Sequence, residues 1–174
     1  MLILKLLSKI IKILESAASP AQLAWGFVLG MFVGFIPGWN LLSLIFVVLI
    51  IILNVNIAFA LFSYGIFTAF AYLLDGVFHK IGVFLLMDSS ALTGFWTALY
   101  TAPVVPYTKF YNTVVLGSFL GALLLTVPMF FAAKYFVILY RTQLSVRIKK
   151  WKIVKVLGSS KLVEMYKKIR RLGD

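Results

Sequence analysis

Hydrophobic residues run almost without interruption through the first half of the chain, and a few polar residues divide the run into segments. No Lys or Arg stands between Lys12 and Lys80, and Asp75 is the only acid after Glu15 in this stretch. A segment of this length with so little charge is solvated by lipid and not by water. The pattern predicts an all-α protein of one domain, a polytopic integral membrane protein.

Proline, glycine and asparagine set the limits of the first two predicted helices. Ser19 and Pro20 are typical of a helix start, and the turn at Pro37 and Gly38 separates a helix over 20–36 from one over 41–53. At about 1.5 Å per residue these helices are roughly 25 and 20 Å long, whereas a hydrocarbon core is about 30 Å thick. We expect a re-entrant hairpin that need not cross the bilayer completely, with two short, tilted full crossings as the alternative.

The later hydrophobic segments differ in length. Residues 57–78 are long enough to span a membrane, whereas residues 91–102 are too short and predict a second interfacial or re-entrant piece. The run over 111–140 exceeds one bilayer thickness, and we expect it to be broken at Pro128. Lys134 lies near the end of that run, from which its side chain can reach the headgroups.

Glycine recurs at every fourth position in 26-GFVLGMFVGFIPG-38. Small residues at this spacing let helices approach closely in lipid, so Gly26, Gly30 and Gly34 predict a packing seam, or alternatively a surface that slides or opens. The expected partners are residues 41–53 and the 111–140 helix, which carries Gly117 and Gly121. Leucine at Gly30 or Gly34 should separate the helices, and alanine should be milder.

A short motif recurs as 29-LGMFVG-34 and 116-LGSFLG-121, and Pro37 and Pro128 follow the two copies. Under the expected topology the copies enter the membrane from opposite sides, as inverted repeats of transporters do. Chance recurrence in so biased a composition is the alternative.

Charge is concentrated at the two ends of the chain, and it distinguishes these terminal segments from the apolar segments between them. The sequence is 63% hydrophobic with a mean hydropathy of +1.04, and it carries 17 Lys and Arg against 5 acids. Residues 1–18 predict an interfacial amphipathic helix, or one packed on protein, and residues 141–174 a basic, cytoplasmic, amphipathic helical tail; residues 19–140 form the membrane domain. The positive-inside rule places both termini in the cytoplasm. The side chains expected at anionic lipid headgroups are Lys5, Lys9, Lys12, Arg147, Lys149, Lys150, Lys152 and Lys155.

Few side chains are available for chemistry. The chain has no Cys, one His and five acids, so we expect no enzyme, no metal and no cofactor. We also expect no nucleic-acid partner for the basic tail, because lipid headgroups explain its lysines and Trp151 better. Asp75 and His79 are spaced to share a helix face, which fits a proton relay or, as we prefer, an interfacial helix end. Asn54 and Asn56 are expected to cap broken helix ends or, alternatively, to line a polar cavity, which Tyr64, Thr68 and Asn112 could join.

The segment 19-SPAQLAWGFVLGMFVGFIPGWN-40, with Asn56 further on, resembles an uncharacterised bacterial inner-membrane family, the domain of unknown function 2062. The later Asn-Pro of that family is replaced here by 63-SYGIFTAF-70. The resemblance implies a small inner-membrane protein of unknown activity. It also points to a subgroup of outer-membrane-bearing bacteria, in which the protein is encoded beside one large partner, and hence to envelope biogenesis.

Two classes of function therefore remain open. The first is a subunit or anchor of an envelope-biogenesis machine, including one that transports lipid, which binds a larger membrane or periplasmic protein. The second is a stand-alone transporter of small solutes or lipids that acts as an oligomer. The small number of charged residues in the membrane segments favours the subunit.

Overall fold

The computed structural model describes residues 10, 11 and 13–144, and this part of the chain is helical and contains no strand. The all-α prediction is confirmed. The α-helices are α2 (Pro20–Phe35), α3 (Leu41–Ile52), α4 (Ile57–Val83), α5 (Thr93–Thr101) and α6 (Thr113–Leu139). Two short π-helical turns, η1 (Phe84–Asp88) and η4 (Tyr140–Leu144), follow α4 and α6, and two 3-10 turns, η2 (Ser90–Leu92) and η3 (Val105–Thr108), lie on either side of α5. The expectations for residues 1–9, 12 and 145–174, including the lysines and Arg147 expected at lipid headgroups, lie outside the described residues.

Two helices are long and apolar enough to cross a membrane. Helix α4 continues through η1 to give 32 residues over Ile57–Asp88, and α6 continues through η4 to give 31 residues over Thr113–Gln143. Helices α2 and α3 are shorter, with 16 and 12 residues. The prediction that the third segment ends at residue 78 is wrong, because α4 runs through the polar residues His79 and Lys80 and ends at Val83.

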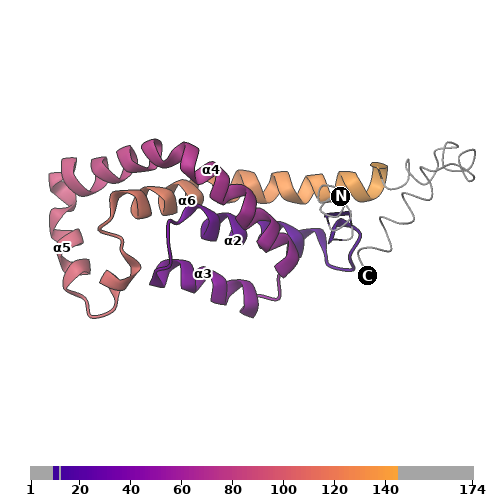
Figure 1. The fold of residues 1–174 in the computed structure, drawn as a ribbon, viewed down its shortest axis with the longest axis horizontal. Helices are drawn as coiled ribbons and strands as arrows, with labels where there is room; N and C mark the ends of the chain where they lie inside the picture. Colours follow the sequence, from indigo (N-terminus) through magenta and orange to yellow (C-terminus); the bar gives the residue numbers. More distant parts are fainter. Residues whose placement is uncertain (1–9, 12, 145–174) are drawn as a thin grey trace, which may run out of the picture.

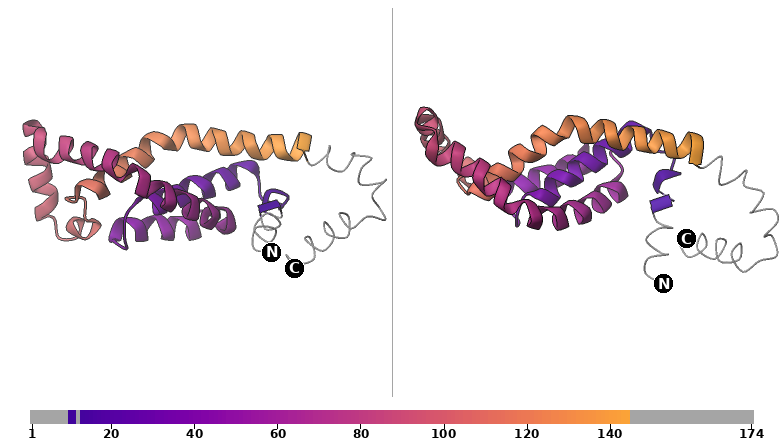
Figure 2. Two further views of the ribbon diagram at one scale, coloured as in Figure 1. Left: turned by 45° about the horizontal axis from the view of Figure 1, so that its top comes forward. Right: turned by 90° about the horizontal axis from the view of Figure 1, so that it is seen from above.

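Helix α6 does not break at Pro128, which is a second correction. Proline lacks an amide hydrogen, so the carbonyl of Leu124 loses its helical partner, but the backbone on both sides stays helical. Pro128 is exposed on the outer side of α6, where its ring displaces no packed neighbour. The helix therefore curves without ending, as Figure 2 shows.

Helix α2 is the central element of the bundle, because it contacts α3, α4 and α6. Helix α4 runs in the same direction as α2, and α3 and α6 run in the opposite direction (Figure 1). The second half of α4 and the first half of α6 extend together beyond the α2–α3 hairpin to α5, and η3 folds back to contact α3.

Phenylalanine rings fill the spaces between these helices. Phe35 on α2 lies edge-on to Phe67 and Phe78 of α4, with ring centroids 5.0 and 5.1 Å apart. Phe32 on the same helix stacks on Phe46 of α3 at 4.2 Å. A second buried cluster joins the segment before α2 to the starts of α2 and α4 and to the end of α6, and consists of Leu14, Leu23, Phe59, Val137 and Tyr140.

Each of the longer helices begins at a side-chain cap. Ser19 accepts a hydrogen bond from the Gln22 amide at 3.1 Å, and the Gln22 side chain accepts one from the Ser19 amide in return. Asn40 caps α3 in the same way with Ser43. The predicted start at Ser19 and Pro20 is confirmed, since reciprocal capping satisfies amides that the first turn leaves unpaired.

Candidate functional site

The glycine face of α2 lies directly against the backbone of α4. A Cβ atom at Gly26 would lie 2.7 Å from the carbonyl oxygen of Asn56, and one at Gly34 would lie 2.8 Å from that of Tyr64. Between them, a Cβ at Gly30 would collide with the carbonyl oxygen of Ala60. The expected partners, α3 and α6, are therefore wrong for this face: the helix that occupies it is α4.

The glycines of α6 face the same helix further along. A Cβ at Gly117 would collide with the carbonyl oxygen of Phe78, and one at Gly121 would lie 2.7 Å from the ring of that residue. The two LGxFxG segments thus pack on successive halves of α4 and run antiparallel to each other. Their equivalent phenylalanines, Phe32 and Phe119, lie 6.0 Å apart.

A cavity of about 250 Å³ opens where the α2–α3 hairpin turns beside α4. The end of α2 and the hairpin tip, residues 36–40, form one wall, lined by Val33, Gly34, Ile36, Pro37, Gly38 and Trp39. Ser43 of α3 closes the cavity at the tip, and α4 forms the other wall with Tyr64, Thr68, Ala71, Tyr72 and Asp75. The α4 wall lies near the middle of the continuous helix Ile57–Asp88.

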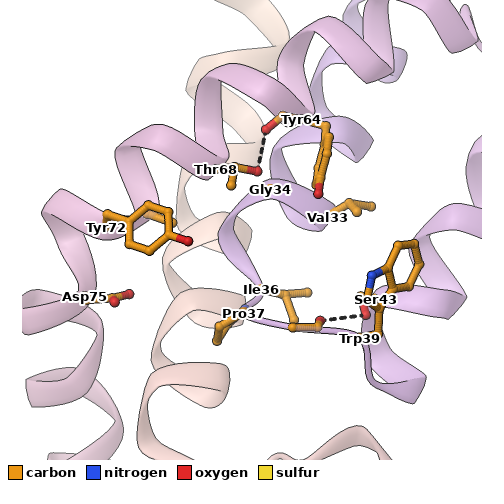
Figure 3. Close-up of a pocket in the computed structure, with 12 residues that line it drawn as sticks. Val33, Gly34, Ile36, Pro37, Trp39, Ser43, Tyr64, Thr68, Tyr72 and Asp75 are labelled. Carbon is orange, nitrogen blue, oxygen red and sulfur yellow. Dashed lines mark hydrogen bonds between the residues drawn. The ribbon is translucent and has the colours of Figure 1, made fainter.

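The polar groups of this cavity fall into two sets (Figure 3). The Thr68 hydroxyl donates to the Tyr64 carbonyl at 2.8 Å, and the Ser43 hydroxyl donates to the Asn40 carbonyl at 2.9 Å, so both serve their own helices. Asp75 and Tyr72 project from α4 toward the space that Trp39 bounds on the opposite side. Asp75, Tyr72 and Trp39 therefore remain available to contact a ligand.

The structure brings together only two of the five residues expected at a polar cavity, Tyr64 and Thr68. Asn56 caps α4 by accepting from the Phe59 amide at 2.9 Å, and Asn112 caps α6 by accepting from the Val114 amide at 2.9 Å. Asn54 is exposed in the α3–α4 turn with φ of 50°. Asn56 therefore takes the capping role that the sequence also allowed, Asn112 caps α6 and does not line the cavity, and the cavity side chains Asp75, Tyr72 and Trp39 were missed.

His79 bridges helices instead of pairing with Asp75. Its Nδ1 atom lies 2.7 Å from the Thr113 hydroxyl at the start of α6, within hydrogen-bond distance. Asp75 lies one turn earlier on α4 and lines the cavity. The geometry gives no support to a proton relay between the two side chains.

Arg141 ties the end of α6 to the segment before α2. Its guanidinium donates to the carbonyl oxygens of Leu14, Ser16 and Ala18 at 2.7, 3.0 and 2.9 Å. These carbonyls follow a helical turn and have no helical partner, so the planar donor group satisfies three acceptors at once. Arg141 thus closes the bundle at the end opposite α5.

Fold and site together define an all-helical protein with two helices of membrane-spanning length and a cavity between a short hairpin and one of them. The family described as "Uncharacterized protein conserved in bacteria (DUF2062)" matches residues 5–145. The chain belongs to this family, as its resemblance to the family predicted. A search of curated proteins and a search of solved structures each found no match.

Proposed function

We propose that this protein is a small inner-membrane subunit that anchors a larger protein of an envelope-biogenesis machine, one that moves lipid. The observation that carries the proposal is a set of exposed apolar side chains on neighbouring helices, which we call the apolar belt. It covers α3, the first two thirds of α4 and the last two thirds of α6, with Ile45, Val48, Ile52, Leu61, Leu73, Leu124, Val127, Phe131 and Phe136. A surface of this kind is covered either by lipid or by apolar protein.

The belt supports a topology of four crossings. Gly26 and Gly34 place α2 beside the first half of α4, and the contact between Trp25 and Phe130 places it beside the second half of α6. All the belt helices therefore lie at the level of the hairpin. Acidic and basic side chains appear on the exposed surface of α4 only beyond the hairpin, at Asp75 and His79. In this arrangement α2 and α3 are two short full crossings, and both termini lie on the cytoplasmic side, where the positive-inside rule places the basic tail.

Helix α3 is the part of the belt best suited to a protein partner. It attaches to the bundle through the Phe46 ring on Phe32 and through contacts with η3, and Ser43 is its only buried residue. Its 12 residues are about 18 Å long, so lipid covers it poorly. We infer that an apolar transmembrane helix of the larger protein packs on the outer face of α3.

Site-specific photo-crosslinking in cells tests this proposal. A photo-crosslinking amino acid at Val48 on α3 should give an adduct with one protein much larger than this chain. The same residue at Leu124, equally part of the belt but on α6, is the matched control and should give no such adduct. Identical adducts at both positions, or none at Val48, would contradict the assignment of α3.

The alternative function is a stand-alone transporter that acts as an oligomer. The cavity favours it, because an acid on a long apolar helix beside a helix break is the arrangement that transporters use for solutes. An adduct from Val48 at twice the mass of this chain, together with lipid or solute movement by the purified protein alone in vesicles, would support the transporter over the subunit.

A further inference from the structure

We propose that the cavity between the hairpin tip and α4 binds an organic ammonium group, which a lipid headgroup or a free amine can supply. The proposal rests on the cavity and not on the partner protein inferred above. It concerns the side chains that neither the bundle core nor the helix caps use.

Charge selects the sign of the ligand. Among the described residues that line the cavity, Asp75 is the only charged one and none is basic. Within the described residues, no hydrogen bond or ion pair engages the Asp75 carboxylate. A carboxylate that faces a partly enclosed space without a partner attracts a cation, and most strongly one that also donates hydrogen bonds.

Aromatic rings select the kind of cation. Trp39 bounds the cavity at the hairpin tip, and Tyr64 and Tyr72 bound it on α4 (Figure 3). The faces of such rings attract alkylammonium groups through cation–π interaction, about 0.5–1 kcal/mol each at exposed sites. Small inorganic cations prefer several oxygen ligands, whereas a single carboxylate lines this cavity. The combination of one acid with three aromatic side chains therefore fits an ammonium group carried on carbon.

The size and exposure of the cavity fit the same ligand. Its volume of about 250 Å³ exceeds what a bare metal ion needs and is suited to a headgroup-sized molecule. Trp39 and Tyr72 are 76% and 78% exposed, so the ligand can enter from outside the bundle. In the four-crossing topology the hairpin tip ends at the edge of the apolar belt, which is the level of lipid headgroups.

Fluorine NMR of the full chain tests the proposal. The protein is labelled with 5-fluorotryptophan in nanodiscs of phosphatidylglycerol, and Trp39→Phe identifies the Trp39 signal. Tetramethylammonium and ethanolamine should shift that signal in a saturable manner, and sodium and potassium at equal concentration should not. Nanodiscs that contain phosphatidylethanolamine distinguish the sources: a Trp39 signal already shifted there, with weaker binding of free amines, identifies the lipid headgroup as the ligand.

The variants assign the effect to the cavity. Asp75→Asn should weaken ammonium binding at least about tenfold, which corresponds to about 1.4 kcal/mol. Asp88→Asn is the matched control, because it removes the same charge from an exposed position outside the cavity and should leave the affinity unchanged. The Trp25 and Trp96 signals report whether each variant is folded.

Tyr72→Leu provides a second variant should Asp75→Asn fail to fold, because its exposed ring supports no core contact. We expect about threefold weaker binding, since one cation–π contact is lost. Unchanged affinity in folded Asp75→Asn, the same Trp39 shift with sodium as with tetramethylammonium, or no shift with any ammonium compound or phosphatidylethanolamine would overturn the proposal.

Discussion

At Gly30 the α2 backbone lies against the carbonyl oxygen of Ala60 on α4, and even a methyl group there would collide with that oxygen. The neighbouring contact adds a polar link, because the buried Ser63 hydroxyl donates to the Phe27 carbonyl across the same interface. Helices that pack in lipid depend on such close contacts, since lipid supplies little hydrophobic drive for association. That alanine is milder than leucine stays a prediction, but the close contact indicates that alanine also destabilises the protein at this position.

Gly30→Ala should lower the stability of the bundle by roughly 1–3 kcal/mol, because the added methyl group overpacks a contact between two backbones. Thermal unfolding in detergent measures the effect. Gly65→Ala is the matched control on α4, where nothing lies within 4 Å of the added atom, and it should stabilise by up to about 1 kcal/mol through helix propensity. A Gly30→Ala protein that melts at or above the wild-type temperature would contradict the close contact.

Arg141→Ala should release the segment before α2 from the end of α6. Three carbonyl acceptors lose their charged donor, and each such hydrogen bond contributes about 1.5–3 kcal/mol. Hydrogen exchange followed by mass spectrometry should show at least about tenfold faster exchange in residues 13–19. Lys134→Ala removes a charge from the same helix without touching these carbonyls, and should leave exchange there unchanged.

The helices of this bundle start where a polar side chain ends an apolar run, and this local signal is why their order and approximate limits could be predicted from the sequence. Ser19, Asn56 and Asn112 each precede a helix and each accept from an amide of its first turn. Pro128 misled the prediction because one missing hydrogen bond on the exposed side of a long helix bends the helix without ending it.

Asn56→Ala and Asn112→Ala should each destabilise the protein by about 1 kcal/mol, because each removes the side-chain acceptor that caps a long helix. Asn54→Gly is the control in the turn before α4. Asn54 has a positive φ of 50°, which glycine adopts freely, so the stability of this variant should be unchanged or slightly higher. Denaturation in mild detergent measures all three. Equal losses at Asn54 and Asn56 would mean that the asparagines act together and not as separate caps.

Helix pairing was harder to predict than the helices themselves. The glycine spacing correctly marks one face of α2, but nothing in the spacing says which helix fills it, and the choice of α3 or α6 was wrong. The helix that packs on this face is determined by the path of the chain. Helix α3 brings the chain back to the start of α2, so α4 begins there and runs parallel to α2. Which helices pair therefore depends on the packing of the whole bundle, which local sequence patterns do not specify.

On the scale of the whole molecule, the cavity combines a pattern that the sequence contains with one that it does not. Tyr64, Thr68, Tyr72 and Asp75 recur at helical spacing and so share one face of α4, which could have marked them as a set. The prediction included only Tyr64 and Thr68 of these four, because the asparagines carry the stronger polar signal in the sequence. Trp39 joins them solely through the turn of the hairpin, a tertiary contact with no signal in the local sequence.

Single cysteines introduced into this cysteine-free chain test the topology. Ser89→Cys and Trp39→Cys should react with a membrane-impermeant thiol reagent in intact cells, and Asn54→Cys should not. Reaction at position 39 separates four crossings from a re-entrant hairpin, whose tip would stay inside the bilayer. Cysteines at Ser8 and Ser159 should resist the reagent if both termini are cytoplasmic, and labelling of one but not the other would exclude an even number of crossings.

The shortness of α2 and α3 affects the bilayer as well as the protein. In the proposed four-crossing topology, helices of 16 and 12 residues are only about 24 and 18 Å long, so the lipids that border them must compress to keep the polar helix ends out of the hydrocarbon. This deformation costs a fraction of a kcal/mol for each ångström of mismatch. A partner helix that covers α3 replaces the compressed lipids and removes that cost. Membrane elasticity would then help to recruit the partner, and association would strengthen in thicker bilayers and weaken in thinner ones.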